Sequence, residues 1–342
     1  MMTEINVKEE HIQKSINELI TLAGADADTF ESQLIAQIIE TSLKLLHESH
    51  DTGQLKLISR SLRELRYAYR VFNAYKGIRR ISIFGSARTG EQHADYKAAK
   101  DFGELIAHQE WMCITGGANG IMKAGLEGAS RESSFGLSIR LPFEVPTNTV
   151  IEGDPKLIVF RYFFTRKLMF MSHSDAVAVF PGGVGTLDEL FEVLTLIQTG
   201  KANIVPVVLM EGEGGVYWEH WQHYLEEHLL ANGWISPSDF NLFYRAPTGE
   251  AGVEHILKFY RRYHSSRYVE DKLIIRMLEP ISEADVEELN ERFSFLVKSG
   301  KIEQRGALEE ETDHLELPRL VFHHTRSDFG SVRALIDAVN NF

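Results

Sequence analysis

The sequence predicts an α/β protein with a doubly wound parallel sheet, a helical extension before the sheet and a small α+β module after it. Three observations predict this fold class. From Arg80 to residue 264, short apolar runs alternate with helical patterns, the runs are apolar at nearly every position, and residues 1–76 before them have a helical pattern alone. Such alternation favours a parallel sheet covered by helices on both faces, whose strands are buried on both sides.

The sheet domain is expected to span residues 77–264. Each apolar run in it is followed by a segment with helical spacing, except the third run, which precedes a loop that contains proline. The expected strands are ISIFG (81–85), WMCITGG (111–117), FGLSIRL (135–141), LIVFRYF (157–163), DAVAVFPGG (175–183) and NIVPVVLM (203–210). The helix GVEHILKFYRRYH (252–264) is expected to close the domain.

Residues 1–76 are expected to form a helical extension. Apolar residues recur there at three- and four-residue steps, first from Leu34 to Leu46 and then from Leu55 to Phe72. The segment HDTGQ, with Gly53, separates the two patterns. The extension carries no catalytic constellation, so we interpret it as a cap or an oligomer contact.

Residues 265–342 are expected to form a βαββα module. KLIIRML predicts a strand, and Ser282 is a candidate N-cap for the helix that follows it. KIEQRGAL and RLVFHHT predict two more strands, and GSVRALIDAVNNF predicts a closing helix. No residue pattern in this module points to chemistry.

Composition restricts the classes of partner. The chain has 342 residues and a formal net charge of −13, which disfavours non-specific binding to nucleic acid or to an anionic membrane. Its single cysteine, Cys113, lies in an apolar run and is expected to be a buried strand residue. Neither a signal sequence nor an apolar run of about 20 residues is present. These features lead us to expect a cytoplasmic protein with no nucleic-acid or membrane partner.

Three glycine-bearing turns follow predicted strands. They are FGSART (84–89), TGGANG (115–120) and PGGVGT (181–186). The carboxyl ends of parallel strands meet at one edge of a sheet, where α/β proteins bind ligands. Glycine lets a ligand approach the backbone closely, and the helix that follows such a turn offers free N–H groups to a phosphate. A single turn of this kind is equally compatible with a plain βα connection, whereas three together favour an anion site.

The spacing of these glycines excludes two common nucleotide motifs. A dinucleotide fingerprint needs G-x-G-x-x-G, but Asp188 stands where the third glycine would follow Gly183 and Gly185. A P-loop needs Gly-Lys-Ser/Thr, and here Gly185 precedes Thr186 and Leu187. A smaller phosphate ligand such as a mononucleotide fits the turns better.

A basic pair precedes the third turn. Arg166 and Lys167 lie at the start of a predicted helix, where cations are slightly unfavourable. Arginine can hold an oxyanion through two parallel hydrogen bonds. This mild misfit favours a phosphate or ribose contact over two solvated charges.

The acidic residues behind the third turn have two interpretations. Thr186 and Glu189 match the capping box T-x-x-E, in which both side chains only close the start of a helix. Alternatively, Thr186 and the glycine amides bind a phosphate while Glu189 faces the neighbouring sugar. A carboxylate beside an anomeric carbon stabilises an oxocarbenium-like transition state or directs water. Glu192, one turn further on, shares that helix face.

Together these elements resemble the LOG (Lonely guy) family. PGGVGTLDE (181–189) is similar to that family's PGGxGTxxE signature, and TRKLMFM (165–171) is similar to the helix start that precedes it. GGANGIMKAGLEGA (116–129) and FGSA (84–87) are similar to two further turns of the family, and the resemblance spans about residues 78–264.

The resemblance implies a Rossmann-like, homodimeric or higher homo-oligomeric enzyme that needs no metal or organic cofactor. It would hydrolyse the N-glycosidic bond of nucleoside 5′-monophosphates, AMP-like or cytokinin ribotides, to free base and ribose 5-phosphate. By position, Arg166 and Glu189 would be catalytic. The remaining expected substrate-binding residues are Gly182, Gly183, Gly185, Thr186, Gly85, Ser86, Gly116, Gly117, Lys167, Met169 and Glu192. The alternative is a carrier that binds a nucleotide or a phosphorylated cofactor without turnover, since molybdenum cofactor carriers resemble the family too.

Two groups of histidines could suggest a metal site. His220, His223 and His228 fall in YWEHWQHYLEEH, beside an apolar stripe at helical spacing. We interpret them as solvated side chains opposite that stripe. His323 and His324 are neighbours in a predicted strand and therefore point to opposite faces. No metal site is predicted.

Overall fold

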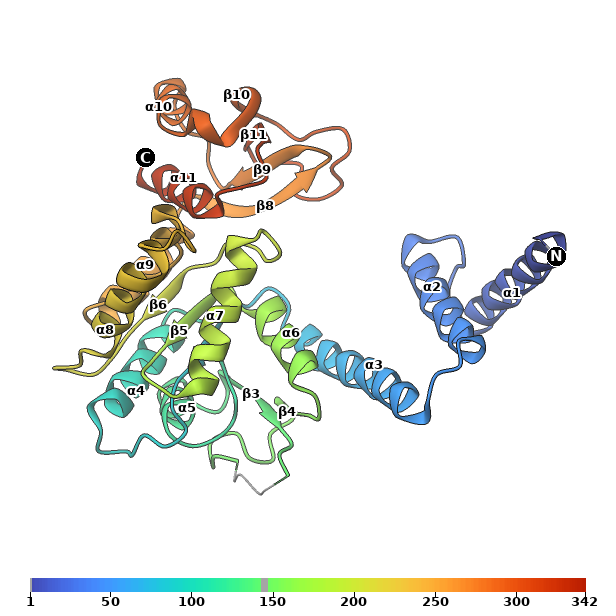
Figure 1. Cartoon of the computed structure of the whole chain (residues 1–342), viewed down its shortest axis with the longest axis horizontal. Coiled ribbons are helices and arrows are strands. Elements are labelled where there is room, and N and C mark those ends of the chain that lie inside the picture. The colour runs from blue at the N-terminus through green and yellow to red at the C-terminus, as the bar shows by residue number, and fades with distance from the viewer. Residues whose placement is uncertain (1, 143–146) are drawn as a thin grey trace. The chain divides into compact units, whose positions relative to one another are not determined.

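The computed structural model describes residues 2–142 and 147–342, and the chain divides into two compact units. The first unit ends at Arg66 and contains α1 (Met2–Leu22), α2 (Phe30–Lys44) and most of α3 (Thr52–Asn73). Helices α1 and α2 pack through Ile16, Ile20 and Ala36. The second unit runs from Tyr67 to the C-terminus (Figure 1). Every helix in the described part of the chain is too short or too polar to cross a lipid bilayer.

A seven-stranded parallel sheet forms the centre of the second unit, with the order β4-β3-β2-β1-β5-β6-β7. This confirms the predicted α/β, Rossmann-like fold. Its strands are β1 (Arg80–Phe84), β2 (Met112–Thr115), β3 (Ser134–Ile139), β4 (Leu157–Phe160), β5 (Ala176–Val179), β6 (Val207–Leu209) and β7 (Tyr244–Arg245). Residues of β1, β2 and β5 are almost all buried, as strands covered on both faces require. The short edge strand β7 was not predicted.

Helices cover both faces of this sheet (Figure 1). One layer contains α4 (Ala94–Ala107), α5 (Ile121–Ala129) and α9 (Gly249–Phe259), and α4 packs against the other two. The other contains α6 (Phe163–His173), α7 (Val184–Gln198) and α8 (Tyr217–Tyr224), which continues as a π-helix to Leu230. The strand order reverses between β1 and β5, which is the point where open α/β sheets form a ligand crevice.

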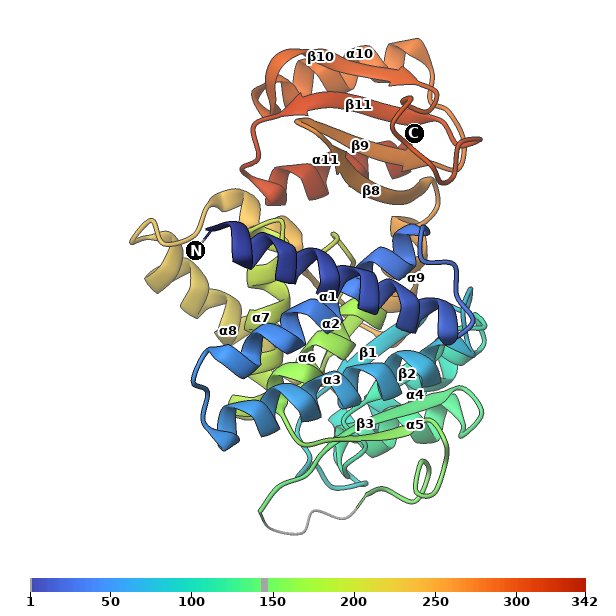
Figure 2. The ribbon, with the colours of Figure 1, turned by 90° about the vertical axis from the view of Figure 1, so that its right-hand side faces the viewer.

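The C-terminal module has one more strand than the sequence predicted. Its antiparallel sheet has the order β10-β11-β9-β8, built from β8 (Tyr263–Val269), β9 (Lys272–Met277), β10 (Val297–Arg305) and β11 (Arg319–His324). Figure 2 shows these strands side by side, with α10 (Glu283–Phe293) and α11 (Phe329–Asn341) packed on the sheet. Strand β8 escaped prediction because this edge strand is polar and half-exposed along its middle. The predicted N-cap Ser282 is confirmed, since its side chain accepts from the Asp285 amide.

A buried ion cluster stabilises this module. Glu311 accepts from Arg276 at 2.7 Å and from Arg319 at 2.7 Å, and its side chain is fully buried. Burial raises the pKa of Glu311, but the hydrogen bonds with Arg276 and Arg319 outweigh it, and the net pKa lies below its usual value. The neighbours His323 and His324 do point apart, because His323 contacts Ser299 whereas His324 is buried against Tyr268.

Candidate active site at the carboxyl edge of the sheet

A cavity of about 740 Å³ opens where the strand order reverses. Ligand sites for small molecules have about this volume. The cavity is lined by parts of all three glycine-bearing turns and by the N-terminal ends of α6 and α7. Its lining residues are Phe84, Gly85, Ser86, Ala87, Arg88, Gly116, Gly117, Ala118, Met122, Ser138, Ile139, Leu141, Thr147, Phe163, Arg166, Gly183, Val184, Gly185, Thr186, Asp188 and Glu189.

Backbone hydrogen bonds tie the three turns together. The Ser86 amide donates to the Pro181 carbonyl at 3.1 Å, and the Ile121 amide donates to the Ser86 carbonyl at 3.0 Å. Gly120 has a positive φ of 66°, and a Cβ there would lie 2.2 Å from the Ser86 carbonyl oxygen. The first turn is therefore held between the other two, which fixes the floor of the cavity.

The third turn leads directly into α7. Gly183 is the N-cap of this helix, with no side-chain capping bond, and its carbonyl accepts from the Thr186 and Leu187 amides. The capping-box alternative is therefore wrong, because Thr186 lies inside the first helical turn rather than before it. A Cβ at Gly183 or Gly185 would meet nothing within 4 Å. The backbone here faces open space, which lets an anion approach the helix N-terminus.

The second turn leaves room for an arginine. A Cβ at Gly116 would lie 2.6 Å from Nη2 of Arg166, so only glycine allows the guanidinium to rest there. Gly117 has a positive φ of 72°, and its carbonyl accepts from the amide of Asn148. The buried Asn148 side chain also donates to the Ala118 carbonyl. These contacts fix the turn that shapes the space beside Arg166.

Arg166 reaches the cavity from the second turn of α6. Its Nε donates to the Leu137 carbonyl of β3 at 2.8 Å, and its guanidinium lies over the Phe170 ring at 5.2 Å from the centroid. Burial lowers the pKa of Arg166, while the nearby Glu189 carboxylate opposes that effect. The group remains a cation, because arginine does not lose its proton in proteins.

Glu189 is a buried carboxyl group, 9% exposed, that lies beside two cations. Burial raises the pKa of Glu189, and the positive charges of Lys167 and Arg166 partly offset this increase. Lys167 Nζ lies 2.8 Å from Asp188, 3.8 Å from Glu189 and 2.5 Å from Glu192. One ammonium group is thus shared by three carboxylates of α7 and offsets only part of their charge, and Glu189 is the most buried of the three.

The structure brings most of the predicted residues together. Those that line the cavity are Arg166, Glu189, Gly183, Gly185, Thr186, Gly85, Ser86, Gly116 and Gly117. Gly182 lies behind the lining, where a Cβ would lie 2.1 Å from Oγ1 of Thr186. It shapes the turn rather than the surface of the cavity.

Besides Gly182, three predicted binding residues do not reach the cavity surface. Met169 is fully buried in α6 and does not line the cavity, so its expected role in substrate binding is wrong and it packs in the core. Lys167 and Glu192 pair with each other on the neighbouring side of α6 and α7. They act on the cavity through Glu189 rather than by touching its contents.

Several lining residues carried no signal in the sequence. Phe163 is 51% exposed at the start of α6, which is unusual for a phenylalanine beside a buried sheet. Arg88 lies inside the first turn, FGSART, and supplies a second cation. Their position in or beside predicted motifs is the only signal that could have indicated these two residues.

Among the residues that the structure describes, no group of three histidine, cysteine, aspartate or glutamate side chains is placed so that it could hold a metal ion. His223 instead pairs with Glu227 one helical turn away, and His220 is exposed. The cavity therefore offers an anion-binding turn, a fixed guanidinium and a buried carboxyl group. Such an arrangement suits a phosphate ester whose reacting carbon develops positive charge.

A family model described as "Possible lysine decarboxylase" matches residues 118–256. A cytokinin riboside 5′-monophosphate phosphoribohydrolase of Arabidopsis thaliana is 29% identical over 186 residues, which cover 53% of this chain and 83% of the relative. An enzyme of the same name from Rhodococcoides fascians is 29% identical over 160 residues, 46% of this chain and 79% of the relative.

Solved structures also match the chain. A molybdenum cofactor binding protein from Rippkaea orientalis is 26% identical, with a TM-score of 0.38, and covers 53% of this chain and 97% of its own. The molybdenum cofactor carrier protein of Chlamydomonas reinhardtii is 20% identical, with a TM-score of 0.37. The match covers 53% of this chain and 97% of the carrier protein.

Proposed function

We propose, on the premise that this chain belongs to the LOG family, that it hydrolyses the N-glycosidic bond of nucleoside 5′-monophosphates. The products would be a free base and ribose 5-phosphate. AMP and cytokinin riboside 5′-monophosphates are the candidate substrates, the latter because the curated relatives carry that activity in their names.

One observation carries the proposal. Arg166 and Glu189 come from two different helices, yet both line one cavity together with the glycine turns. A core-packing role would not require a guanidinium and a buried carboxyl group to face the same space. Ionisable groups with shifted pKa values in a cavity are typical of catalytic sites.

The phosphate would bind at the start of α7. The first amides of a helix have no carbonyl partner one turn earlier, and the helix dipole places partial positive charge there. The Thr186 amide already donates to the Gly183 carbonyl, so the amides of Val184 and Gly185 would bind the phosphate. Gly183 and Gly185 leave the backbone open to an anion, and Arg166 supplies the full charge. Asp188 also lines the cavity, and its ion pair with Lys167 at 2.8 Å offsets part of its repulsion of a phosphate.

The ribose would then lie toward Glu189. As the bond between the anomeric carbon and the base nitrogen breaks, the electron pair leaves with the base and the sugar becomes cationic. The Glu189 carboxylate stabilises that charge and accepts a proton from water, whose oxygen bonds to the anomeric carbon. The departing base takes up the proton that Glu189 accepted from water, either directly or through solvent, so the base leaves in its neutral form and Glu189 is ionised again.

Incubation of the full chain with AMP and, separately, with a cytokinin riboside 5′-monophosphate tests this proposal. Chromatography should detect equal amounts of free base and ribose 5-phosphate. Tight nucleotide binding without release from either nucleotide would contradict hydrolysis and favour the carrier alternative. The absence of both nucleotide binding and base release would contradict both functions.

A further inference from the structure

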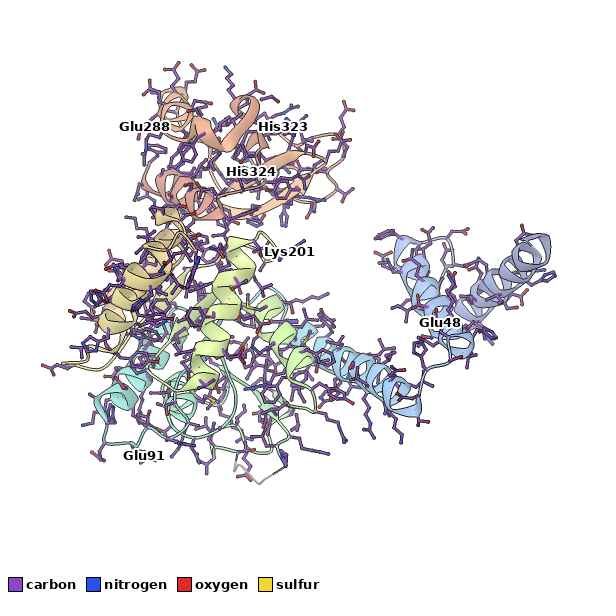
Figure 3. All side chains as sticks on the ribbon, in the orientation of Figure 1. Glu48, Glu91, Lys201, Glu288, His323 and His324 are labelled. Atoms are coloured by element: carbon purple, nitrogen blue, oxygen red, sulfur yellow. The ribbon has the colours of Figure 1, made fainter. Side chains whose placement is uncertain are left out.

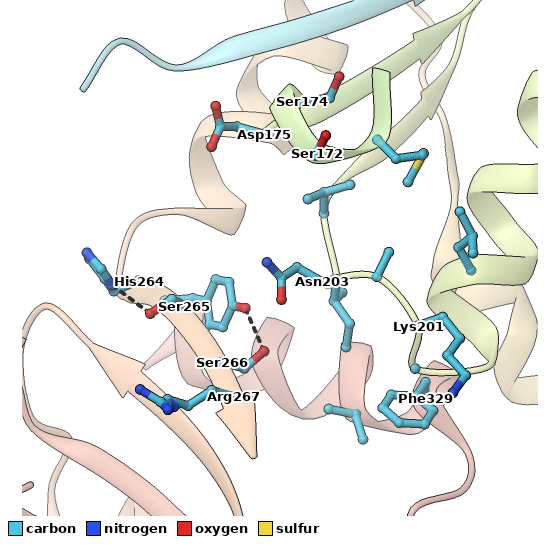
Figure 4. Close-up of a pocket in the computed structure, with 18 of the residues that line it drawn as sticks. Ser172, Ser174, Asp175, Lys201, Asn203, His264, Ser265, Ser266, Arg267 and Phe329 are labelled. Atoms are coloured by element: carbon cyan, nitrogen blue, oxygen red, sulfur yellow. Dashed lines mark hydrogen bonds between the residues drawn. The ribbon is translucent and has the colours of Figure 1, made fainter. Parts of the chain in front are cut away.

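A second cavity, of about 580 Å³, lies at the opposite edge of the parallel sheet, between that sheet domain and the C-terminal module (Figure 4). Its walls include the C-terminal ends of α6 and α7 on one side and β8 with α11 on the other. Ligand pockets occur preferentially at such domain boundaries and have about this volume.

Hydroxyl and amide groups line the middle of this cavity. Figure 4 shows Asn203 in the centre, across from Ser266, which accepts from the Tyr263 hydroxyl at 3.0 Å. Ser265 contacts His264 Nδ1 at 2.8 Å. Such groups can bind a polyhydroxylated molecule, because each hydroxyl both donates and accepts.

The charge of the lining is opposite to that of the chain. Arg80, Lys201 and Arg267 line the cavity, and Asp175 is the only carboxylate among the described lining residues, whereas the whole chain has a net charge of −13. Arg267 also pairs with Asp313 at 3.0 Å and Arg80 lies beside Asp175, so Lys201 is the lining cation that no described carboxylate pairs with. Arg267 and Lys201 are exposed at the cavity, and Lys201 follows α7 (Figure 3). A local excess of cations in an acidic protein favours an anionic ligand.

The loop that carries Lys201 is fixed to the C-terminal module. Gly200 has a positive φ of 67°, and a Cβ there would lie 2.2 Å from the ring of Phe329 in α11. The turn after α7 is therefore packed tightly on the module. A ligand between them would contact both bodies through a rigid wall rather than a free loop.

The two cavities share two helices. In α6, Phe163 and Arg166 line the first cavity, whereas Met171 and His173 line the second. In α7, Glu189 lines the first cavity and Leu196 the second. At 1.5 Å per residue, α6 and α7 span roughly 16 and 22 Å, so the catalytic pair and the second cavity lie at opposite ends of the same rigid elements.

We propose that the second cavity is an effector site for a small phosphate ester, whose binding changes turnover at the first cavity. The effect on turnover rests on the proposed function, whereas binding does not. The shared chemistry is a phosphate attached to a sugar, which could be supplied as ribose 5-phosphate or as a nucleoside triphosphate.

Calorimetry tests binding without any need for turnover. Ribose 5-phosphate, ATP and inorganic phosphate are titrated separately into the Arg166→Ala protein, which lacks the main anion partner of the first cavity. We expect one of the two esters to bind. When Lys201→Glu and Arg267→Glu are added to Arg166→Ala, the Kd of that ester should rise about tenfold or more. Lys298→Glu with Lys301→Glu, a matched charge change on exposed residues of β10, should leave the Kd unchanged.

Kinetics tests the coupling in the chain with Arg166 intact. The ester that binds should change kcat/KM for AMP at least about twofold, and Lys201→Glu with Arg267→Glu should abolish that response while basal turnover is kept. Equal Kd values in the two charge variants, or binding of inorganic phosphate alone, would contradict the proposal that the second cavity binds a phosphate ester. Binding without any kinetic response in an active enzyme would overturn the coupling. Absence of AMP hydrolysis would contradict only the proposed function, because calorimetry still decides the site.

Discussion

The two cavities of the second unit differ in what lines them. The first is formed by glycine turns and backbone amides, to which α6 and α7 add Arg166 and Glu189. The second is formed mainly by side chains from separate elements, including Asn203, Ser266 and Arg267. A site made of backbone leaves a contiguous motif in the sequence, whereas a site made of dispersed side chains leaves none. Because α6 and α7 line both cavities, substitutions at either end of these helices can test how the two cavities differ.

The largest expected effect is the loss of turnover in Glu189→Gln. The amide keeps the shape of the side chain but can neither accept a proton from water nor stabilise a cationic sugar. We expect kcat for base release to fall about 10²- to 10⁴-fold, while nucleotide binding is retained. Glu192→Gln is the matched control, because Glu192 does not line the cavity, and its kcat should fall less than about tenfold. Equal losses in the two variants would contradict the role of Glu189.

A smaller loss is expected from Gly116→Ala. The added methyl group would lie 2.6 Å from Nη2 of Arg166 and 2.7 Å from Sδ of Met122, and both are ends of flexible side chains. The fold should therefore survive while the guanidinium moves. A displacement of about 1 Å can lower turnover about 10²-fold. Kinetics of AMP hydrolysis measure the loss, and thermal unfolding should show an unchanged midpoint.

Gly90→Ala is the control for that substitution. A Cβ at Gly90 meets nothing within 4 Å, so both turnover and stability should stay at their original values. Normal turnover in Gly116→Ala would show that the exact position of Arg166 is unimportant. An unfolded Gly116→Ala protein would contradict the inference that only side-chain ends are displaced.

The same contrast explains what the sequence could predict. Strands β1 to β6 were predicted because most of their residues are apolar, and those of β1, β2, β5 and β6 are almost all buried. Strands β7 and β8 were missed because an edge strand that is short or half-exposed has no such pattern. In the site, the spacing of PGGVGTLDE indicated Glu189, but it could not show that α7 begins at Val184, which removed the capping box.

Side-chain direction was the part that sequence could not give. Met169 and Arg166 are three residues apart on α6, and only the packing of that helix decides which of them reaches the cavity. Lys167 was predicted to touch the substrate, yet it pairs with carboxylates from α7 that are about 20 residues away in sequence. Contacts between separate elements depend on tertiary packing, which no local pattern records.

Lys167→Met should change the pH dependence of the first cavity. The positive charge of Lys167 lowers the pKa of Glu189, so its removal raises that pKa further above the usual value. Because Glu189 must be ionised to act as a base, the acid limb of the kcat profile should move to higher pH by about one unit. At a pH on that limb, turnover should fall about tenfold.

Lys201→Met is the control from the other end of α7. Lys201 lines only the second cavity, so its removal should leave the acid limb in place. A profile measured from pH 4 to 8 for the two variants separates these outcomes. An unmoved limb in Lys167→Met would show that the lysine does not control the ionisation of Glu189.

The smallest effect concerns stability beside the second cavity. His173 stacks on Phe72 with ring centroids 3.9 Å apart, and its Nδ1 lies 3.2 Å from the Met169 carbonyl. Burial, together with the nearby charge of Arg80, lowers the pKa of His173 to about 4. The unfolded chain therefore binds a proton more tightly than the folded chain. The contribution of His173 to stability is complete above pH 6.5 and is lost as the pH falls toward 4.

His173→Phe keeps the stacked ring and removes the titration. Urea unfolding between pH 4.5 and 7.5 should show a shallower loss of stability in the variant, equivalent to the uptake of up to about one proton fewer on unfolding. The pKa of His255 is lowered to about 4 as well, by burial and by Arg333, so part of the slope should remain. His255→Phe alone should remove a similar share, because its ring also stacks on a neighbour, Tyr244. If His173→Phe leaves the slope unchanged, His173 binds a proton equally well in the folded and unfolded chain, and its charge then adds to the cations of the second cavity only below its ordinary pKa of 6.5.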